Sequence, residues 1–182
     1  MMRRRPALAV SLYVESRRCV VVGEGALADE RAARLTEAGA IVERVATADW
    51  RAELARGAAM IFASDAEHAD EVTRDARAAG ALAYVLDQPD RSDLAMPALA
   101  RRGSLQIAIS TDAQAPALAR RLRGELQRLL DEAGPELDLL LAELEAERAG
   151  QPAGRERREA LQRSAERLTV VGSIEVRREE QD

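Results

Sequence analysis

The sequence predicts an α/β protein whose core is a doubly wound parallel sheet. Between residues 19 and 86, short apolar segments alternate with longer segments in which apolar residues recur at helical spacing. The connections between these segments are short, which favours right-handed β-α-β crossovers. The first apolar segment, residues 19–22, is one cysteine followed by three valines, as expected for a strand that is covered on both faces.

Four strands and three helices are predicted in this part of the chain. The first helix follows the glycine-rich turn at residues 23–25 and ends at Gly39, since glycine commonly terminates helices. The next is a short helix at residues 49–56. The third helix, residues 67–79, is capped by Ser64-Asp65 and ends before Gly80. The predicted strands are residues 19–22, 41–46, 58–63 and 82–86.

The pattern changes after Asp87. One further strand is predicted at residues 105–109, and Pro116 opens an amphipathic helix with its leucines on one stripe. The remaining predictions are helices at residues 136–148 and 155–168, a breaker-rich linker at 150–154, a small hairpin from 168–171 and 174–176, and frayed residues 177–182.

The composition argues against several classes of protein. All 27 basic residues are arginine, and 32 acidic residues outnumber them, so the net charge is −5. A broad nucleic-acid-binding face needs an excess of positive charge and is not expected. The single cysteine, Cys19, permits no intrachain disulfide, and no apolar run reaches the roughly 18 residues of a membrane helix. Since no secretory leader pattern begins the chain, we expect a cytoplasmic protein.

The turn after the first strand has the pattern Gly23-x-Gly25-x-x-Ala28 and precedes a predicted helix. The first glycine permits the tight turn, the second lets a pyrophosphate approach the backbone, and the helix N-terminus supplies amides. The alternative is a glycine-rich turn that binds nothing. No acidic residue closes the second strand, and Arg44 suits a 2′-phosphate or the surface, so NAD and NADP both stay open. The predicted cofactor contacts of this turn are Gly23, Glu24, Gly25, Ala26 and Leu27.

Asp87 ends the fourth predicted strand, at the sheet edge where ligands of doubly wound sheets bind. A carboxylate partly withdrawn from water there is suited to act as a general base; a plain turn residue is the alternative. His68, the only histidine, is interpreted as a solvated helix residue. Neither His68 nor Cys19 has the spacing of a zinc ligand, so no metal site is predicted.

Several arginines flank the strand at residues 105–109. If they face one cleft, they form a rim whose guanidinium groups suit carboxylates. The alternative is a set of solvated helix faces. These arginines are Arg101, Arg102, Arg120, Arg121 and Arg123.

Three segments resemble signature elements of one known family. Residues 96–111, MPALARRGSLQIAIST, continued by PALARRLR from Pro116, are similar to its most specific signature. Residues 84–89, YVLDQP, resemble its Asn-Val-Val-Asp element, and residues 21–25, VVGEG, resemble its Gly-Gly-Gly cofactor turn. The family is that of precorrin-2 dehydrogenase/sirohydrochlorin ferrochelatase, the N-terminal half of siroheme synthases. The resemblance covers roughly residues 8–145.

The resemblance implies an NAD-dependent oxidation of precorrin-2 to sirohydrochlorin, with insertion of ferrous iron as an optional second activity. It implies a homodimer with a Rossmann domain (residues 1–95), a dimerisation segment (96–131) and a C-terminal helical region (132–182). Asp87 corresponds to the family's catalytic aspartate. Further cofactor contacts are expected at Thr47, Ala48, Ser64 and Asp65. The octacarboxylate substrate is expected to contact Ser110, Thr111, Arg101, Arg102, Arg120 and Arg121.

Three positions depart from the family pattern, and each adds bulk or negative charge. Glu24 stands in place of a glycine, Tyr84 in place of the asparagine, and Asp112-Ala113 in place of Gly-Gly. These departures motivate an alternative of a different class, a catalytically degenerate family member that binds a tetrapyrrole or a partner protein. A nucleotide-sensing Rossmann protein without tetrapyrrole contact is a third reading.

Overall fold

The computed structural model describes residues 7–64, 68–112, 114–172 and 174. The chain divides into two compact units. The first consists of residues 1–98 and 110–119, and the second of residues 99–109 and 120–182. Each unit has its own sheet and its own apolar core, so each is described separately.

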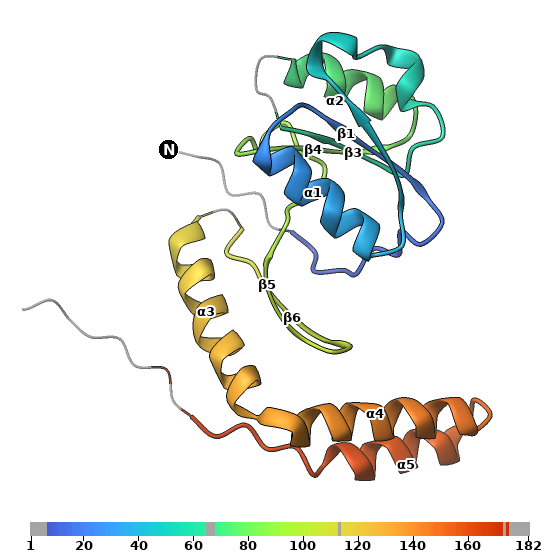
Figure 1. The fold of residues 1–182 in the computed structure, drawn as a ribbon, viewed down its shortest axis with the longest axis vertical. Coiled ribbons are helices and arrows are strands. Elements are labelled where there is room, and N and C mark those ends of the chain that lie inside the picture. Colours follow the sequence, from blue (N-terminus) through green and yellow to red (C-terminus); the bar gives the residue numbers. More distant parts are fainter. Residues whose placement is uncertain (1–6, 65–67, 113, 173, 175–182) are drawn as a thin grey trace, which may run out of the picture. The chain divides into compact units, whose positions relative to one another are not determined.

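The first unit is built on a four-stranded parallel sheet in the order β2-β1-β3-β4 (Figure 1). The strands are β1 (Arg18–Val22), β2 (Ile41–Val45), β3 (Met60–Ala63) and β4 (Leu82–Val85). Each pair in the order is parallel, which confirms the predicted α/β class with a Rossmann-type sheet. The chain reverses its winding direction between β1 and β3, and ligands of such sheets bind outside the carboxyl ends at this point.

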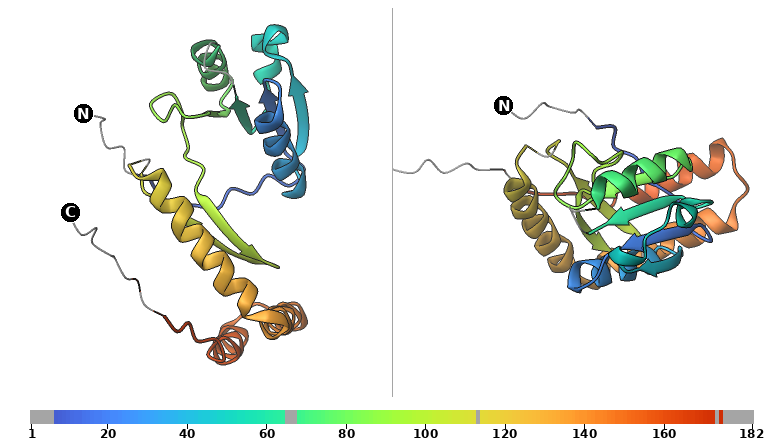
Figure 2. Two further views of the ribbon diagram at one scale, coloured as in Figure 1. Left: turned by 60° about the vertical axis from the view of Figure 1, so that its left-hand side comes forward. Right: turned by 90° about the horizontal axis from the view of Figure 1, so that it is seen from above.

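Helices cover opposite faces of this sheet (Figures 1 and 2). Alternate residues of a strand point to opposite faces, so Val21 and Phe62 pack with α1 (Ala26–Glu37). Val22 and Ile61 pack with α2 (Ala69–Ala78) on the other face. The central strands are therefore buried on both sides, and full burial of each such side chain contributes about 1.5–3 kcal/mol.

The predicted helix at residues 49–56 is wrong. The structure has two short 3₁₀ turns instead, η1 (Thr47–Asp49) and η2 (Ala52–Ala55), separated by Trp50 in an extended conformation. The indole of Trp50 is buried, and its Nε1 donates a hydrogen bond to Asp75 Oδ2 at 3.1 Å. An extended residue lets the ring reach the core under α2, and this contact outweighs the helical spacing of the segment.

The second unit contains a two-stranded sheet of β5 (Ala98–Arg102) and β6 (Leu105–Ile109). The sequence predicts β6 but not β5, whose first residue still belongs to the first unit. Gly103 has a φ of 53° in the two-residue connection, a conformation that favours glycine. Ala100 of β5 is fully buried and packs with Leu130 and Leu137 in the core of this unit.

Three helices complete the chain: α3 (Pro116–Glu132), α4 (Gly134–Gly150) and α5 (Arg155–Ala165). The last two lie side by side as a pair (Figure 2). The predicted hairpin is wrong for the residues that the structure describes, because 168–172 and 174 form no strand there. In the described part of the chain, no helix is both long and apolar enough to cross a membrane.

Candidate functional site

The glycine-rich turn lies at the carboxyl end of β1, at the point where the winding reverses. Gly23 has a φ of 118°, and a Cβ at this position would lie 1.8 Å from Ser64 Oγ. Gly25 has a φ of 83° and precedes the first residue of α1. Among the described residues, a Cβ at Gly25 would meet no atom within 4 Å. Contact and backbone conformation thus both require glycine at position 23, whereas the space in front of Gly25 is open.

The start of α1 fits a dinucleotide diphosphate. Within the part of the chain that the structure describes, no side chain caps this helix, so the amides of its first turn are available, and Gly25, Ala26 and Leu27 are exposed. The partial positive charge of a helix N-terminus favours phosphate. Glu24 is exposed at the same turn, which places one acidic side chain beside this position.

Arg44 supports the turn from the neighbouring strand β2. Its Nη2 donates to the carbonyl oxygen of Gly23 at 3.2 Å, and its Nη1 lies 2.5 Å from Asp29 Oδ1. Asp29 belongs to the first turn of α1, so this ion pair offsets an acidic charge close to the phosphate position. Arg44 therefore stabilises the glycine turn in this structure, whether the cofactor is NAD or NADP.

The other predicted cofactor contacts follow neighbouring strands. Ser64 directly follows β3, and both its backbone N–H and its hydroxyl donate to the carbonyl oxygen of Val22, at 3.0 and 3.3 Å. The structure therefore brings Ser64 against the glycine turn. Thr47 and Ala48 lie in η1, just beyond the carboxyl end of β2. Asp65 lies outside the described residues.

Asp87 lies beyond the carboxyl end of β4, on the same sheet edge as the glycine turn because all four strands are parallel. It is exposed and has a φ of 54°, a left-handed conformation that aspartate tolerates better than most residues. The turn presents the carboxylate to solvent at this edge. Its charge acts on Tyr84: burial raises the pKa of the Tyr84 phenol, Arg31 lowers it, and Asp87 raises it further.

Arg31 is a charged residue that the sequence does not single out, and its charge acts on the same Tyr84 phenol as that of Asp87. Its guanidinium carbon lies 5.0 Å from the ring centre of Phe62 and 5.8 Å from that of Tyr84. These two rings stack with their centres 5.3 Å apart. Burial lowers the pKa of the Arg31 guanidinium. The sequence offers one signal for Arg31: it is a basic residue within the apolar stripe of α1.

Ser110 and Thr111 hold the loop that precedes α3. Ser110 Oγ accepts a hydrogen bond from the N–H of Asp112 at 3.3 Å, and Thr111 Oγ1 accepts one from the N–H of Ala115 at 3.2 Å. Asp112 has a φ of 49°, the conformation that glycine adopts most readily. The hydroxyl groups thus shape this loop in the first unit.

Some arginines of the predicted rim make contacts within the second unit. Arg102 donates to both carboxylate oxygens of Asp138, at 2.8 and 2.6 Å, and to the carbonyl oxygen of Leu130 at 3.0 Å. These contacts raise the pKa of Arg102 and lower that of Asp138. Arg121 pairs with Glu125 at 2.5 Å, while Arg120 is exposed.

Two other arginines of the rim also make contacts within the second unit. Arg123 Nε donates to the carbonyl oxygen of Leu99 at 3.2 Å. The backbone N–H and carbonyl of Arg101 both bond to the side-chain amide of Gln127, at 2.9 and 3.0 Å. Arg101, Arg102 and Arg123 therefore help to fix the two-stranded sheet against α3.

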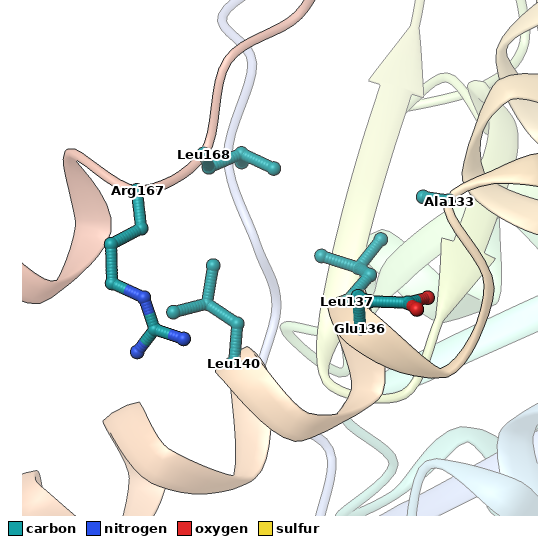
Figure 3. Close-up of a pocket in the computed structure, with 6 residues that line it drawn as sticks. All are labelled: Ala133, Glu136, Leu137, Leu140, Arg167 and Leu168. Atoms are coloured by element: carbon teal, nitrogen blue, oxygen red, sulfur yellow. The ribbon is translucent and has the colours of Figure 1, made fainter.

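The second unit also contains a cavity of about 190 Å³ beside α4 (Figure 3). It contains none of the predicted site residues. Among residues 7–64, 68–112, 114–172 and 174, no three His, Cys, Asp or Glu side chains are grouped to hold a metal ion. The cavity is lined by Ala133, Glu136, Leu137, Leu140, Arg167 and Leu168.

Comparison with known proteins identifies relatives of both parts of the chain. Residues 10–98 match the family described as "Putative NAD(P)-binding", and residues 102–129 match "Sirohaem biosynthesis protein central". The chain is 31% identical to siroheme synthase 1 of Aeromonas salmonicida over 144 residues, which is 68% of this chain and 31% of that protein. It is 32% identical to siroheme synthase of Chromobacterium violaceum over 142 residues, 66% of this chain and 30% of that protein.

A solved structure titled "SirC, precorrin-2 dehydrogenase" has a similar fold. Its TM-score is 0.67 at 20% sequence identity, over 86% of this chain and 88% of that chain. The sheet, the turn and the matched family together define an NAD(P)-binding protein of the Rossmann type. The chain belongs to the precorrin-2 dehydrogenase/sirohydrochlorin ferrochelatase family of the siroheme synthases, as the sequence predicts. It spans about a third of the length of these curated relatives.

Proposed function

We propose that this chain is an NAD-dependent precorrin-2 dehydrogenase of siroheme biosynthesis. The observation that carries the proposal is the open, uncapped glycine turn at the same sheet edge as Asp87. The relatives supply the reaction, because their names are siroheme synthase and precorrin-2 dehydrogenase. The same family also motivates ferrous iron insertion as a second activity, with iron as a substrate.

The reaction removes one hydride and one proton from precorrin-2, so that precorrin-2 and NAD⁺ give sirohydrochlorin, NADH and a proton. When bound, NAD⁺ would supply the hydride acceptor. The amides of Gly25, Ala26 and Leu27 hold its diphosphate, and Ser64 keeps the turn in shape from the next strand. Asp87 accepts the proton at its carboxylate, which is exposed beyond the end of β4.

The assembly proposed here is a cytoplasmic homodimer. Residues 1–95 form the cofactor domain, 96–131 the dimerisation segment and 132–182 the helical region. Leu118 and Leu129 of α3 are 53% and 41% exposed, and leucines of one helical stripe left in solvent are suited to a second copy of the chain. Sedimentation equilibrium tests this assembly, and a monomer at micromolar concentration would refute it. The substrate contacts proposed here are the ones expected from the sequence: Ser110, Thr111, Arg101, Arg102, Arg120 and Arg121.

The direct test mixes the purified chain with precorrin-2 and NAD⁺ and follows the absorbance of sirohydrochlorin. We expect product formation that requires NAD⁺ or NADP⁺. No product at high protein concentration would overturn the proposal. Sirohydrochlorin binding without turnover would instead support the second candidate, a catalytically degenerate member that binds a tetrapyrrole or a partner. Glu24, an exposed acid at the phosphate position, favours that candidate.

A further inference from the structure

Arg31 has a chemical environment that its role in packing does not explain. Its Nε and Nη1 are buried and have no hydrogen-bond partner among the described residues. Burying a charged donor without an acceptor is unfavourable, and such groups call for a specific explanation. The nearest acidic neighbour in the helix, Glu30, pairs with Arg34 at 2.5 Å. Arg31 is therefore a cation whose buried N–H groups have no acceptor within this part of the structure.

The stacking of Arg31 fixes where this cation lies. Its guanidinium lies over Phe62, one residue before the end of β3, and over Tyr84, one residue before the end of β4. The cation thus lies against the second halves of β3 and β4, and Asp87 follows two residues beyond the end of β4. A guanidinium that stacks on aromatic rings keeps its N–H edge available to a planar anion.

This position differs from the phosphate position of the glycine turn. Arg31 is six residues beyond Gly25 along α1, which corresponds to about 9 Å at 1.5 Å per residue. A diphosphate bound at the first helical turn would use backbone amides and not this guanidinium. The first unit therefore offers two separate anion positions, one at the glycine turn and one at Arg31.

We propose that Arg31, supported by the rings of Phe62 and Tyr84, binds one carboxylate of the tetrapyrrole substrate and thereby places it beside Asp87. The inference rests on the proposed function, which supplies an octacarboxylate. Nε and Nη1 are buried, but the residue as a whole is only partly buried, so a carboxylate would approach the guanidinium from the part of the side chain that remains accessible. Arg31 is a positioning residue in this scheme, and Asp87 remains the group that moves the proton.

The test compares Arg31→Gln with a matched control, Arg34→Gln, which removes an exposed arginine from the same helix. Sirohydrochlorin is titrated by its own absorbance, and NAD⁺ by calorimetry. We expect Arg31→Gln to weaken sirohydrochlorin binding by about 10- to 100-fold, the usual effect of losing a charge-assisted hydrogen bond, and to leave NAD⁺ binding unchanged. Arg34→Gln should change neither.

Three results would overturn the inference. Equal sirohydrochlorin affinity in Arg31→Gln and wild type would show that the guanidinium binds no carboxylate, while the proposed function stands. A loss of NAD⁺ affinity instead would identify a cofactor phosphate as the anion. No sirohydrochlorin binding by the wild type would refute the inference together with the proposed function. If Arg31→Gln does not fold, Arg31→Lys keeps the charge without the planar fork and should bind sirohydrochlorin more weakly than wild type; unchanged affinity would count against the inference.

Discussion

The Oγ of Ser64 occupies the space that a side chain on Gly23 would need, 1.8 Å from the position of its Cβ. Ser64, which follows β3, therefore restricts position 23, which follows β1, to glycine. Because Ser64 also bonds to Val22, the two strand ends form one structure at the carboxyl edge. Substitutions at the turn test this relationship directly.

Gly23→Ala should damage both folding and cofactor binding. The left-handed φ of 118° costs about 1–3 kcal/mol for a non-glycine residue, and the collision with Ser64 adds to that. Urea unfolding and NAD⁺ calorimetry measure the two effects. Gly25→Ala is the matched control: it also places alanine at a positive φ, 83°, but its Cβ meets no described atom, so it should cost less stability while still narrowing the phosphate position. Equal losses of stability in the two variants would contradict the proposed contact.

Asp87→Asn should reduce turnover by about 10²- to 10⁴-fold, the range usual for a general acid or base, with little change in NAD⁺ affinity. Asparagine tolerates the left-handed φ of 54° as aspartate does, so the turn should remain intact. Single-turnover kinetics with precorrin-2 and NAD⁺ measure the chemical step. A turnover rate within twofold of wild type would remove Asp87 from the proton transfer.

Trp50→Phe should destabilise the first unit by about 1–3 kcal/mol, because the buried carboxylate of Asp75 loses the donor that lies 3.1 Å away. Asp75→Asn retains an acceptor oxygen and should lose less. Guanidinium chloride unfolding followed by circular dichroism provides both values. If Trp50→Phe is as stable as wild type, the indole hydrogen bond is not a source of stability.

The stability of the first unit should fall at alkaline pH. Burial raises the pKa of the Cys19 thiol above its ordinary value of 9.0, so the unfolded chain ionises first as the pH rises. The contribution of Cys19 is therefore complete below pH 9.0 and is lost as the pH rises through the folded pKa. Cys19→Ala should show a shallower decline of unfolding free energy above pH 9.0 than wild type. An identical decline would assign the effect to other groups, such as Tyr84.

Asp138→Asn should lower the thermal stability of the second unit at neutral pH. The Arg102 guanidinium lowers the pKa of Asp138, so this stabilisation is present above the ordinary value of 3.8 and is lost as the pH falls through the lower folded pKa. The difference in melting temperature between wild type and Asp138→Asn should therefore shrink in acid. Arg121→Ala removes an exposed ion pair within α3 and should have a smaller effect at neutral pH.

The sequence predicts the central strands well, because Val20, Val21 and Ile61 lie in uninterrupted apolar runs that only a doubly covered sheet buries. It does not predict β5, since Ala98–Arg102 contains no β-branched residue and depends on pairing with β6 and on the burial of Ala100. Arg102, the last residue of β5, bonds to Asp138 and to Leu130, which lie far along the chain, so sequence spacing does not reveal these contacts.

The candidate site likewise contains residues that the sequence predicts and one that it does not. The glycine turn and Asp87 carry local signals, a βα turn motif and a strand end, so the sequence finds them. Arg31 can be recognised only in the folded structure, where Phe62 and Tyr84, which are distant in sequence, lie beneath its guanidinium. A charged residue in an apolar helical stripe is a weak signal by itself, because long side chains often extend from such positions to solvent.

The burial of Trp50 has a practical consequence for spectroscopy. It is the only tryptophan of the chain, and it lies in the first unit, on the face of the sheet opposite to α1. Its emission should report the integrity of that unit, while the far-ultraviolet signal is weighted toward the long helices α3, α4 and α5. A single denaturation experiment read at both wavelengths can therefore distinguish sequential from concerted melting of the two units.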